Sequence, residues 1–488
     1  MTAGLERTPV LVGIGMATQR HEDCLQALEP LDLMLAAVAA AGRDSGVAAT
    51  LAGTGYIAVP RGRWAYRNPA GAIAHAIGAP TATTVLASVG VLQQSLIGEA
   101  CARIVRGETH TTLVAGSDCG YRLLRGQISG QPLGERAQDN DPDQSPAPKD
   151  DLFHAVETRA GFAMPVGLYA IMESALRAQQ GWSVAEHRDR LATAYAGFSA
   201  IAAANPHAWS RTVVDATTIR EGSARNPMQA FPYTRFHCSS WNVDQASALL
   251  FCSAARAQAL GIARDRWVFP LASTESNHMV TVSARADLGA CVGARIAGAA
   301  ALDAAGVTAG QLDFIELYSC FPIAVSTYAA ALGIAVTRTP TVTGGMPFAG
   351  GPFNNYVLHA TARAAELLRA RGRGTALVTS VSGMLTKQGF GVWSAAASPR
   401  GFVGADLSTT VARELRTCEV IDHYSGTATI AGYTVLHGRN QQARGVALVD
   451  TPQGARVLTS TAAAHLLESM QREEWVGRRV TVQDDVLV

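Results

Sequence analysis

An internal repeat constrains the fold of this chain more than any other feature of its sequence. One copy, GVLQQSLIGEACARIVRGETHTTLVAGS, begins at Gly90, and the other, GPFNNYVLHATARAAELLRARGRGTALVTSVSG, begins at Gly351. Each has a glycine, a pair of amide side chains, an Ala-rich segment with apolar residues at helical spacing, and then a β-rich run. Two such strand–helix–strand units predict a duplicated α/β core with two facing helices. The alternative is chance similarity between two Ala-rich helices.

The rest of the chain divides into an α/β part and a β-rich end. Short β-rich runs alternate with helical stretches up to about residue 400, which is typical of α/β layers with both sheet faces covered. The polar segment 134–151 predicts a surface loop, and two helices are expected after it. Residues 407–488 read as strands, turns and one helix, which predicts a small five-stranded barrel of the OB type. Because this end lacks a basic, aromatic face, packing or partner contact is favoured over oligonucleotide or sugar binding.

Composition excludes several classes of function. A chain of 488 residues is too long for one ordinary core, so two or three domains are expected. A net charge of +1 offers no strong field for nucleic acid or an anionic membrane. The N-terminus lacks a signal-peptide pattern and no apolar run reaches the roughly 18 residues of a membrane span, so a cytoplasmic protein is expected. The eight cysteines have no zinc spacing, which predicts reduced thiols and no metal site.

Four short motifs are weak candidates for chemistry. VGIGMATQ, from Val12, lacks the third glycine of a dinucleotide fingerprint. GSDCG resembles a nucleophile elbow but has Asp118 at its centre. RGRWAYR, at residues 61–67, has three arginines that could meet the phosphates of a CoA-type ligand, although a solvated loop is favoured. Neighbouring His237 and Cys238 could form a dyad, but adjacent residues on a strand point to opposite faces, so a structural role is favoured.

Several longer stretches together resemble the thiolase superfamily. They are GVLQQSLIGEACARIVRGE, NPHAW, FPYTRFHCSSWNVDQASALL, RWVFPLAST, ELYSCFPIAV, TVTGGMPFAGGPFNNYVLH and LTKQGFGVWS. The sequence is most similar to sterol-carrier-type thiolases and, among these, to thiolase-like proteins of type 1, which carry an additional C-terminal domain. The resemblance implies a five-layered αβαβα fold of two similar halves, over 1–270 (with a loop insertion over 121–235) and 271–400, followed by the OB-like β-barrel domain over 407–488.

The resemblance also implies where a thiolase active site would lie, and the sequence departs from that pattern. The nucleophilic cysteine at the start of the first buried helix is replaced by Gly90. In the Gly-His-Pro loop, Gly350 is followed by Gly351 in place of histidine. The second cysteine corresponds to Val381, and the oxyanion-hole asparagine or histidine to Tyr318. Covalent acyl transfer needs a nucleophile and a base within reach of each other, so ordinary thiolase turnover is not expected, while the three glycines are predicted to let a ligand approach the backbone.

A different polar set remains near the expected centre. Tyr318 and Cys320 are two residues apart, so their side chains share one side of an extended segment. Asn355 and His359 are four residues apart, so they share one face of a helix. We predict these four as catalytic residues that polarise a thioester carbonyl or ketone and move a proton without an acyl-enzyme. Two alternatives remain open: His359 as a core histidine bonded to backbone, and Cys320 as a small packing residue.

The leading hypothesis is a thiolase-like protein that acts on acyl-CoA or a related thioester. The activity expected is of acyltransferase type, or forms or cleaves a carbon–carbon bond, without the usual cysteine nucleophile. No tightly bound cofactor is expected, because coenzyme A would be part of the substrate, and neither nucleic acid nor a membrane span is expected. Monomer and homodimer are both open, as are the acyl chain and the reaction direction. The alternative is a catalytically silent binder of acyl-CoA or lipid, with the C-terminal domain as a partner surface.

Overall fold

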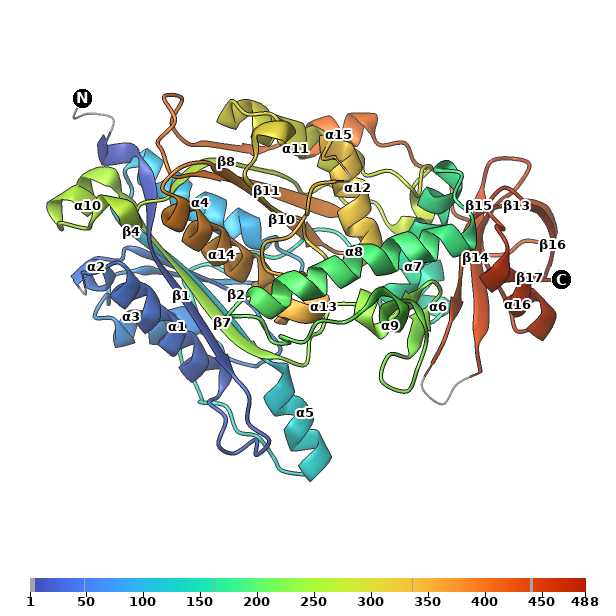
Figure 1. The fold of residues 1–488 in the computed structure, drawn as a ribbon, viewed down its shortest axis with the longest axis horizontal. Helices are drawn as coiled ribbons and strands as arrows, with labels where there is room; N and C mark the ends of the chain where they lie inside the picture. The colour runs from blue at the N-terminus through green and yellow to red at the C-terminus, as the bar shows by residue number, and fades with distance from the viewer. Residues whose placement is uncertain (1–4, 48, 163, 336, 439–441) are drawn as a thin grey trace.

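Five layers of helices and sheets stack across the main body of the molecule, and a small domain lies at one end (Figure 1). The computed structural model describes residues 5–47, 49–162, 164–335, 337–438 and 442–488. Helices and sheets alternate from layer to layer, so each sheet has helices on both of its faces. The predicted αβαβα fold of two similar halves is therefore confirmed.

The first sheet is formed by the N-terminal half. In spatial order it contains β1 (Pro9–Gln19), β7 (Asp244–Ser253), β4 (Thr111–Cys119), β2 (Tyr56–Pro60) and β3 (Thr83–Ala87). All residues of β4 and β7 are buried, as expected for strands that are covered on both faces. β4 lies antiparallel to β7 on one side and parallel to β2 on the other.

The second sheet repeats this pattern. In spatial order it contains β12 (Val403–Asp406), β8 (Phe269–Ser276), β11 (Lys387–Ser394), β10 (Thr375–Ser382) and β9 (Phe314–Glu316). β10 lies antiparallel to β11 and parallel to β9. Thus β10 occupies in its sheet the place that β4 occupies in the first, as the sequence repeat predicts.

Two central helices lie between the sheets, α4 (Gln93–Arg106) and α14 (Tyr356–Arg371). Each ends at a glycine in the left-handed region, Gly107 and Gly372, which no β-carbon obstructs. The amide residues of the repeat join the two halves: Gln93 Oε1 accepts a hydrogen bond from Val357 N at 2.7 Å, and Gln93 Nε2 donates to Asn354 Oδ1 at 3.3 Å. The duplication therefore brings one amide residue of each copy, Gln93 and Asn354, into contact.

The outer layers are helical. Against the first sheet lie α1 (Pro30–Asp44) and α3 (Pro69–Ala76), with the short α2 (Ala49–Ala52) between them in sequence. Beyond the second sheet lie α11 (Val292–Ala305), α12 (Pro322–Leu332) and α15 (Ser408–Glu414). Two short helices complete this body, α10 (Ala254–Ala259) after β7 and α13 (Met346–Ala349) before α14.

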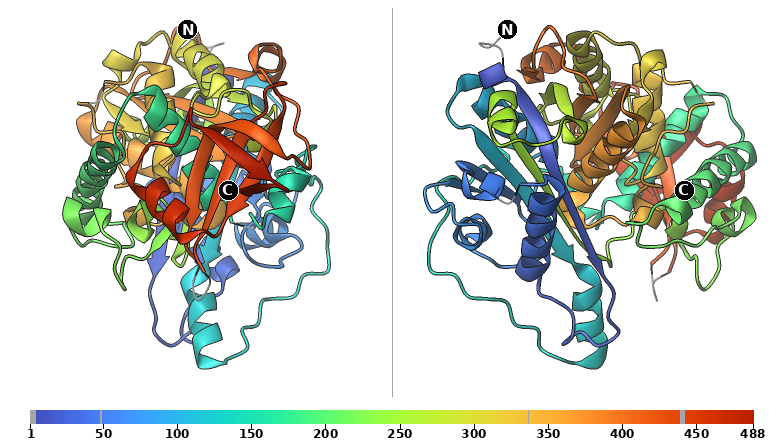
Figure 2. Two further views of the ribbon diagram at one scale, coloured as in Figure 1. Left: turned by 90° about the vertical axis from the view of Figure 1, so that its right-hand side faces the viewer. Right: turned by 60° about the vertical axis from the view of Figure 1, so that its left-hand side comes forward.

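A long excursion separates β4 from β7. It contains α5 (Gly120–Ser129), α6 (Ala155–Arg159), α7 (Val166–Gln179), α8 (Val184–Ala204), α9 (Ala216–Arg220), β5 (Met228–Ala230) and β6 (Tyr233–Thr234). α7 and α8 confirm the two helices expected after the polar loop. The loop itself, residues 134–151, runs along the outside of the molecule from α5 (Figure 2).

The C-terminal domain is a small closed barrel. Its elements are β13 (Gly426–Leu436), β14 (Arg444–Asp450), β15 (Arg456–Thr461), α16 (Ala464–Arg472), β16 (Arg479–Gln483) and β17 (Val486–Leu487). The strand order β14-β15-β17-β16-β13 is closed by pairing of β13 with β14. This confirms the predicted OB-like barrel. β5 and β6 of the excursion extend the same sheet, through the pair Leu436 and Ala230.

Membrane spans, metal sites and disulfides were each considered from the sequence, and the described part of the chain shows the following. Within it, no helix is both long and apolar enough to cross a membrane. No group of three or more His, Cys, Asp or Glu side chains in the described residues is arranged to hold a metal ion. Each of the eight cysteines, all of which are described, is an unbridged thiol.

Candidate functional site

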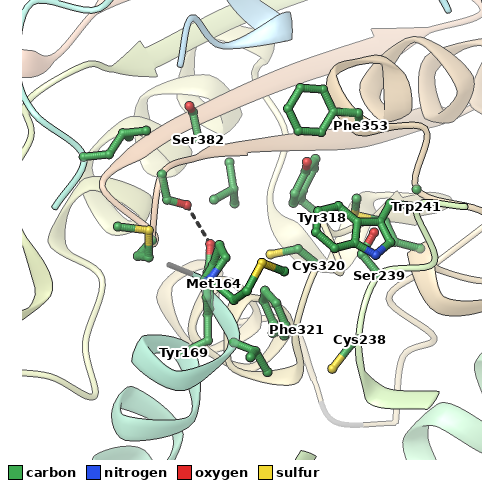
Figure 3. Close-up of a pocket in the computed structure, with 18 of the residues that line it drawn as sticks. Met164, Tyr169, Cys238, Ser239, Trp241, Tyr318, Cys320, Phe321, Phe353 and Ser382 are labelled. Atoms are coloured by element: carbon green, nitrogen blue, oxygen red, sulfur yellow. Dashed lines mark hydrogen bonds between the residues drawn. The ribbon is translucent and has the colours of Figure 1, made fainter. Parts of the chain in front are cut away.

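A cavity of about 340 Å³ lies where the two central helices begin (Figure 3). It is lined from the loops before α4 and α14, from the end of β10, from the segment after β9 and from α7. The four positions at which the sequence lacks a thiolase group all line it: Gly90, Gly351, Val381 and Tyr318. Segments far apart in the chain therefore meet at the place that the resemblance predicts.

Tyr318 and Cys320 both line this cavity, on the extended segment that follows β9. Tyr318 is held by its backbone N–H, which donates to Thr379 Oγ1 at 2.8 Å, and its ring packs edge-on against Tyr356. Its hydroxyl has no hydrogen-bond partner among the described residues. Burial raises the pKa of Tyr318 well above its ordinary value, so the hydroxyl is a neutral donor at physiological pH.

Cys320 is a thiol in this setting. Burial raises its pKa to about 12, although a hydrogen bond with Tyr169 acts in the opposite direction. A reactive cysteine needs a depressed pKa, since the thiolate is the nucleophile. Cys320 therefore offers a neutral, polarisable group rather than a replacement for the missing nucleophile.

Tyr169 brings α7 to the cavity. Its hydroxyl donates to Gly383 O at 2.8 Å and accepts from Leu385 N at 3.3 Å, so it fixes the turn after β10 (Figure 3). Its ring packs on Phe321 with a centroid distance of 4.4 Å. The excursion between β4 and β7 thus supplies a wall of the site, and periodicity in the sequence gives no signal for this contact.

Two hydrogen-bond donors from the second half of the chain hold the backbone carbonyl of Gly90 in place. Ser382 Oγ donates to Gly90 O at 3.1 Å, and Lys387 Nζ donates to the same oxygen at 3.0 Å. Burial lowers the pKa of Lys387, and Asp150 and Glu275 act in the opposite direction. Lys387 does not itself line the cavity, so its contact is with the backbone that forms the cavity wall.

The two glycines that stand in place of the thiolase groups, Gly90 and Gly351, have little space beside them for a side chain. Gly90 has a φ of 99°, in the left-handed region, and a β-carbon there would lie 2.9 Å from Pro148 Cγ. A β-carbon on Gly351 would lie 2.0 Å from Ser239 Oγ. Neighbouring side chains therefore take up the space of a β-carbon at both positions. A cysteine at 90 or a histidine at 351 would require Pro148 or Ser239 to move.

Asn355 and His359 do not join Tyr318 and Cys320. Neither lines the cavity. Asn355 faces the first sheet, since a β-carbon on Gly116 of β4 would lie 2.7 Å from its Oδ1. His359 lines a separate narrow space of about 10 Å³, together with Gly350. The predicted four-residue cluster is thus split, because helical spacing puts Asn355 and His359 on one face without saying which neighbour that face meets.

His359 and His237 are both buried and neutral. Burial lowers the pKa of each to about 3, with nearby His207 adding to the effect at His359. His237 Nδ1 accepts from Thr234 N at 3.2 Å and so caps a turn, while its neighbour Cys238 lines the cavity. His237 lies in the turn η2 (Arg235–His237) and not on the expected strand, and its ring is used to cap that turn, so the pair does not form a dyad.

The entrance to the cavity is apolar. Val89, Met164 and Trp241 line it and are among the large hydrophobic side chains that remain exposed to solvent. No side chain among the described lining residues carries a formal charge. Of the arginines at residues 61–67, Arg63 forms an ion pair with Asp118, and Arg67 forms one with Asp141. The cavity therefore suits an uncharged, largely apolar group.

Comparison with known proteins agrees with this geometry. The family described as "thiolase-like protein type 1 additional C-terminal domain" matches residues 406–486. The chain is similar in structure to a monomeric SCP2-thiolase like protein type 1 from Mycobacterium smegmatis, with a TM-score of 0.82, 26% identity and 99% of each chain covered. None of the curated proteins matches it in sequence.

Two further solved structures share the fold at lower similarity. For the acetyl-CoA acetyltransferase from Syntrophomonas wolfei the TM-score is 0.55 at 19% identity, covering 80% of this chain and 99% of that one. For an Ltp2-ChsH2(DUF35) aldolase the TM-score is 0.58 at 16% identity, covering 79% of this chain and 98% of that one.

The fold is that of the thiolase superfamily, and the four positions at which the sequence departs from the thiolase pattern line one cavity. More specifically, the chain is similar over 99% of its length to an SCP2-thiolase like protein type 1, and its residues 406–486 match the additional C-terminal domain of thiolase-like protein type 1.

Proposed function

We propose that this protein binds the acyl part of an acyl-CoA or related thioester in the cavity and forms or cleaves a carbon–carbon bond near its carbonyl, without an acyl-enzyme. The observation that carries the proposal is a cavity at the position expected for a thiolase active site, although Gly90 and Gly351 stand in place of the nucleophilic cysteine and the histidine base. Coenzyme A would be part of the substrate, with its charged nucleotide outside the uncharged cavity.

Three neutral donors could stabilise charge that develops on a carbonyl oxygen. The first is the Tyr318 hydroxyl, which has no hydrogen-bond partner among the described residues. The others are the backbone N–H groups of Gly90 and Gly383, two cavity-lining residues whose N–H groups donate to no other described residue. Preorganised donors of this kind favour an enolate or oxyanion over the neutral carbonyl.

Cleavage next to a thioester carbonyl needs such stabilisation. When the bond between C2 and C3 of a 3-hydroxyacyl thioester breaks, its electron pair passes to the thioester as an enolate, and the C3 hydroxyl becomes a carbonyl by giving its proton to water. C2 then takes up a proton, so the balance needs no oxidant or reductant. A structural relative named as an aldolase makes carbon–carbon chemistry a reasonable use of this fold.

A panel of CoA thioesters tests the proposal. Saturated, 3-hydroxyacyl and 3-ketoacyl thioesters of several lengths would be incubated with the protein while free CoA and carbonyl products are measured. Tyr318→Phe keeps the ring and removes the donor, so we expect a loss of about 10²-fold in kcat/KM. Tyr424→Phe, in the segment that precedes β13 and packs against the barrel core away from the cavity, is the matched control. Equal turnover by Tyr318→Phe and the control would refute the assigned role.

One observation favours the second candidate, a silent binder of acyl-CoA or lipid. At neutral pH none of the described cavity-lining side chains is a base, since burial raises the pKa values of Tyr318 and Cys320. Trp241 at the entrance provides a fluorescence signal for binding. Quenching by acyl-CoA without turnover of any thioester in the panel would establish the binder and reject the enzyme.

A further inference from the structure

A second hydroxyl besides that of Tyr318 lines the cavity without a hydrogen-bond partner among the described residues, and it belongs to Ser239. Ser239 is half-buried, and its oxygen is not among the fully buried side-chain atoms that lack a partner, so it is open to solvent in the cavity. Figure 3 shows Ser239 on the side of Trp241 and Ser382 on the other side, with Tyr318 between them.

The backbone around Ser239 is fixed by hydrogen bonds, so its hydroxyl has a defined place. Ser239 N donates to Cys320 O at 3.1 Å, and Ser240 N donates to Met346 O at 3.1 Å. The carbonyl of Ser240 accepts from Gly351 N at 2.8 Å. A β-carbon on Gly351 would lie 2.0 Å from Ser239 Oγ. The hydroxyl therefore stands beside the position that corresponds to the thiolase histidine.

A saturated acyl chain and a substrate oxygen have opposite effects on this hydroxyl. Its surroundings are largely apolar, with Trp241, Phe353 and Met346 among the lining residues. A saturated chain that displaces water from the Ser239 hydroxyl leaves it without a hydrogen bond, which costs free energy. An oxygen on the chain restores a hydrogen bond, because a serine hydroxyl both donates and accepts. The cavity therefore favours a chain that carries an oxygen at this place.

The proposed cleavage needs two oxygens on the substrate, the thioester carbonyl and the oxygen on C3. Among the described lining residues, two hydroxyls are free of hydrogen bonds, those of Tyr318 and Ser239. We propose that Ser239 binds the oxygen on C3 while Tyr318 binds the carbonyl, so that the cavity selects 3-hydroxyacyl and 3-ketoacyl thioesters over saturated ones. This assignment rests on the proposed function, from which it takes the place of the carbonyl, and adds the residue that selects the substrate.

Calorimetry with two analogues that cannot react tests the assignment. S-(3-hydroxyoctyl)-CoA and S-octyl-CoA are thioethers that differ only in the hydroxyl on C3, and they lack the carbonyl that an enolate needs. Their binding is therefore measured whether or not the protein is an enzyme. We expect the wild-type protein to bind the hydroxylated analogue at least about fivefold more tightly, the factor given by one neutral hydrogen bond.

Ser239→Ala removes the hydroxyl and should bind the two analogues equally. It should also bind S-octyl-CoA at least as tightly as the wild type does, which shows that the cavity is intact. Ser240→Ala is the matched control, since Ser240 is the next residue, does not line the cavity and forms its hydrogen bonds through the backbone. This control should keep the wild-type preference.

A preference that disappears in Ser239→Ala and persists in Ser240→Ala supports the assignment even if no thioester is turned over, in which case only the proposed reaction fails. Equal affinity of the wild type for the two analogues, no binding of either, or a preference that persists in Ser239→Ala overturns the assignment. Turnover of the thioester panel would then leave the proposed reaction in place.

Discussion

Two glycines at the centre of the molecule stand where a thiolase has catalytic side chains, and their surroundings leave little space for a side chain. Gly90 is held in the left-handed region beneath Pro148, and Gly351 has Ser239 where a side chain would stand. A residue at position 90 would meet backbone strain and a close contact with Pro148, and one at position 351 would overlap the hydroxyl of Ser239. The two glycines are therefore part of how the loops pack, and we expect that restoring the side chains would not restore a thiolase site.

The double variant Gly90→Cys/Gly351→His tests this. We expect no acetyl adduct on residue 90 after incubation with acetyl-CoA, as judged by intact mass. We also expect the free energy of unfolding to fall by about 2 kcal/mol or more, because a non-glycine residue at positive φ and an overpacked contact both cost stability. An adduct at full occupancy with unchanged stability would show that the loops accommodate the thiolase groups.

His359 should make stability depend on pH in a definite direction. Its pKa is about 3 in the folded protein, where burial lowers it, and 6.5 is its ordinary value. Between these values the unfolded chain binds a proton that the folded chain does not, so the folded state loses stability as the pH falls. In His359→Gln that dependence is absent, so its free energy of unfolding relative to wild type should rise by about 1.4 kcal/mol per unit of falling pH between about pH 6 and pH 4.

Urea unfolding at a series of pH values measures this difference. His75→Gln, at an exposed position on α3, is the control and should follow the wild-type curve. If the curves of His359→Gln and wild type run parallel, the histidine is not buried as a neutral group.

At the scale of elements, α7 connects the cavity with the C-terminal barrel. One end supplies Tyr169 to the cavity, and two turns further along Arg177 reaches the barrel. Arg177 is buried, and it donates to Tyr433 Oη at 2.8 Å and to Glu474 at 2.7 Å. The barrel is thus fixed to the helix that forms part of the site wall.

Arg177→Met should loosen this attachment. Removing the buried guanidinium leaves Tyr433 without its hydrogen-bond donor and the partly exposed Glu474 without its charged partner, so we expect a loss of about 2 kcal/mol or more in the free energy of unfolding. Arg472→Met breaks an exposed pair with Glu468 on α16 and should cost less than about 1 kcal/mol. Chemical unfolding compares the two variants, and equal small losses would show that α7 and the barrel are held together by apolar packing alone.

At the scale of the whole molecule, the chain covers one of its own sheet edges. β3 is the edge strand of the first sheet, and the loop 134–151 pairs with it: Leu86 N donates to Gln144 O at 3.0 Å, and Gln144 N donates to Thr84 O at 3.1 Å. Ser88 N donates to Pro146 O at 2.8 Å further along. Uncovered edge strands pair with other chains, and here those backbone groups are already used.

We therefore predict a monomer of 51.1 kDa in solution, measured by light scattering coupled to size-exclusion chromatography. Replacing residues 138–148 by a Gly/Ser linker of equal length uncovers β3 and should produce dimers that grow with protein concentration. A wild-type dimer, or a linker variant that remains monomeric at high concentration, would show that this edge does not control association.

The sequence by itself determined the duplicated layers, the positions of α7 and α8, the C-terminal barrel and the absence of the thiolase groups. These features are recorded locally, in helical spacing, in buried β-runs and in glycines such as Gly107 that end a helix. Only the tertiary structure decided which side chains meet. Spacing places Asn355 and His359 on one face but not against which neighbour, and Tyr169 reaches the cavity through a contact between segments more than two hundred residues apart. Such contacts depend on how whole elements pack, which no local pattern specifies.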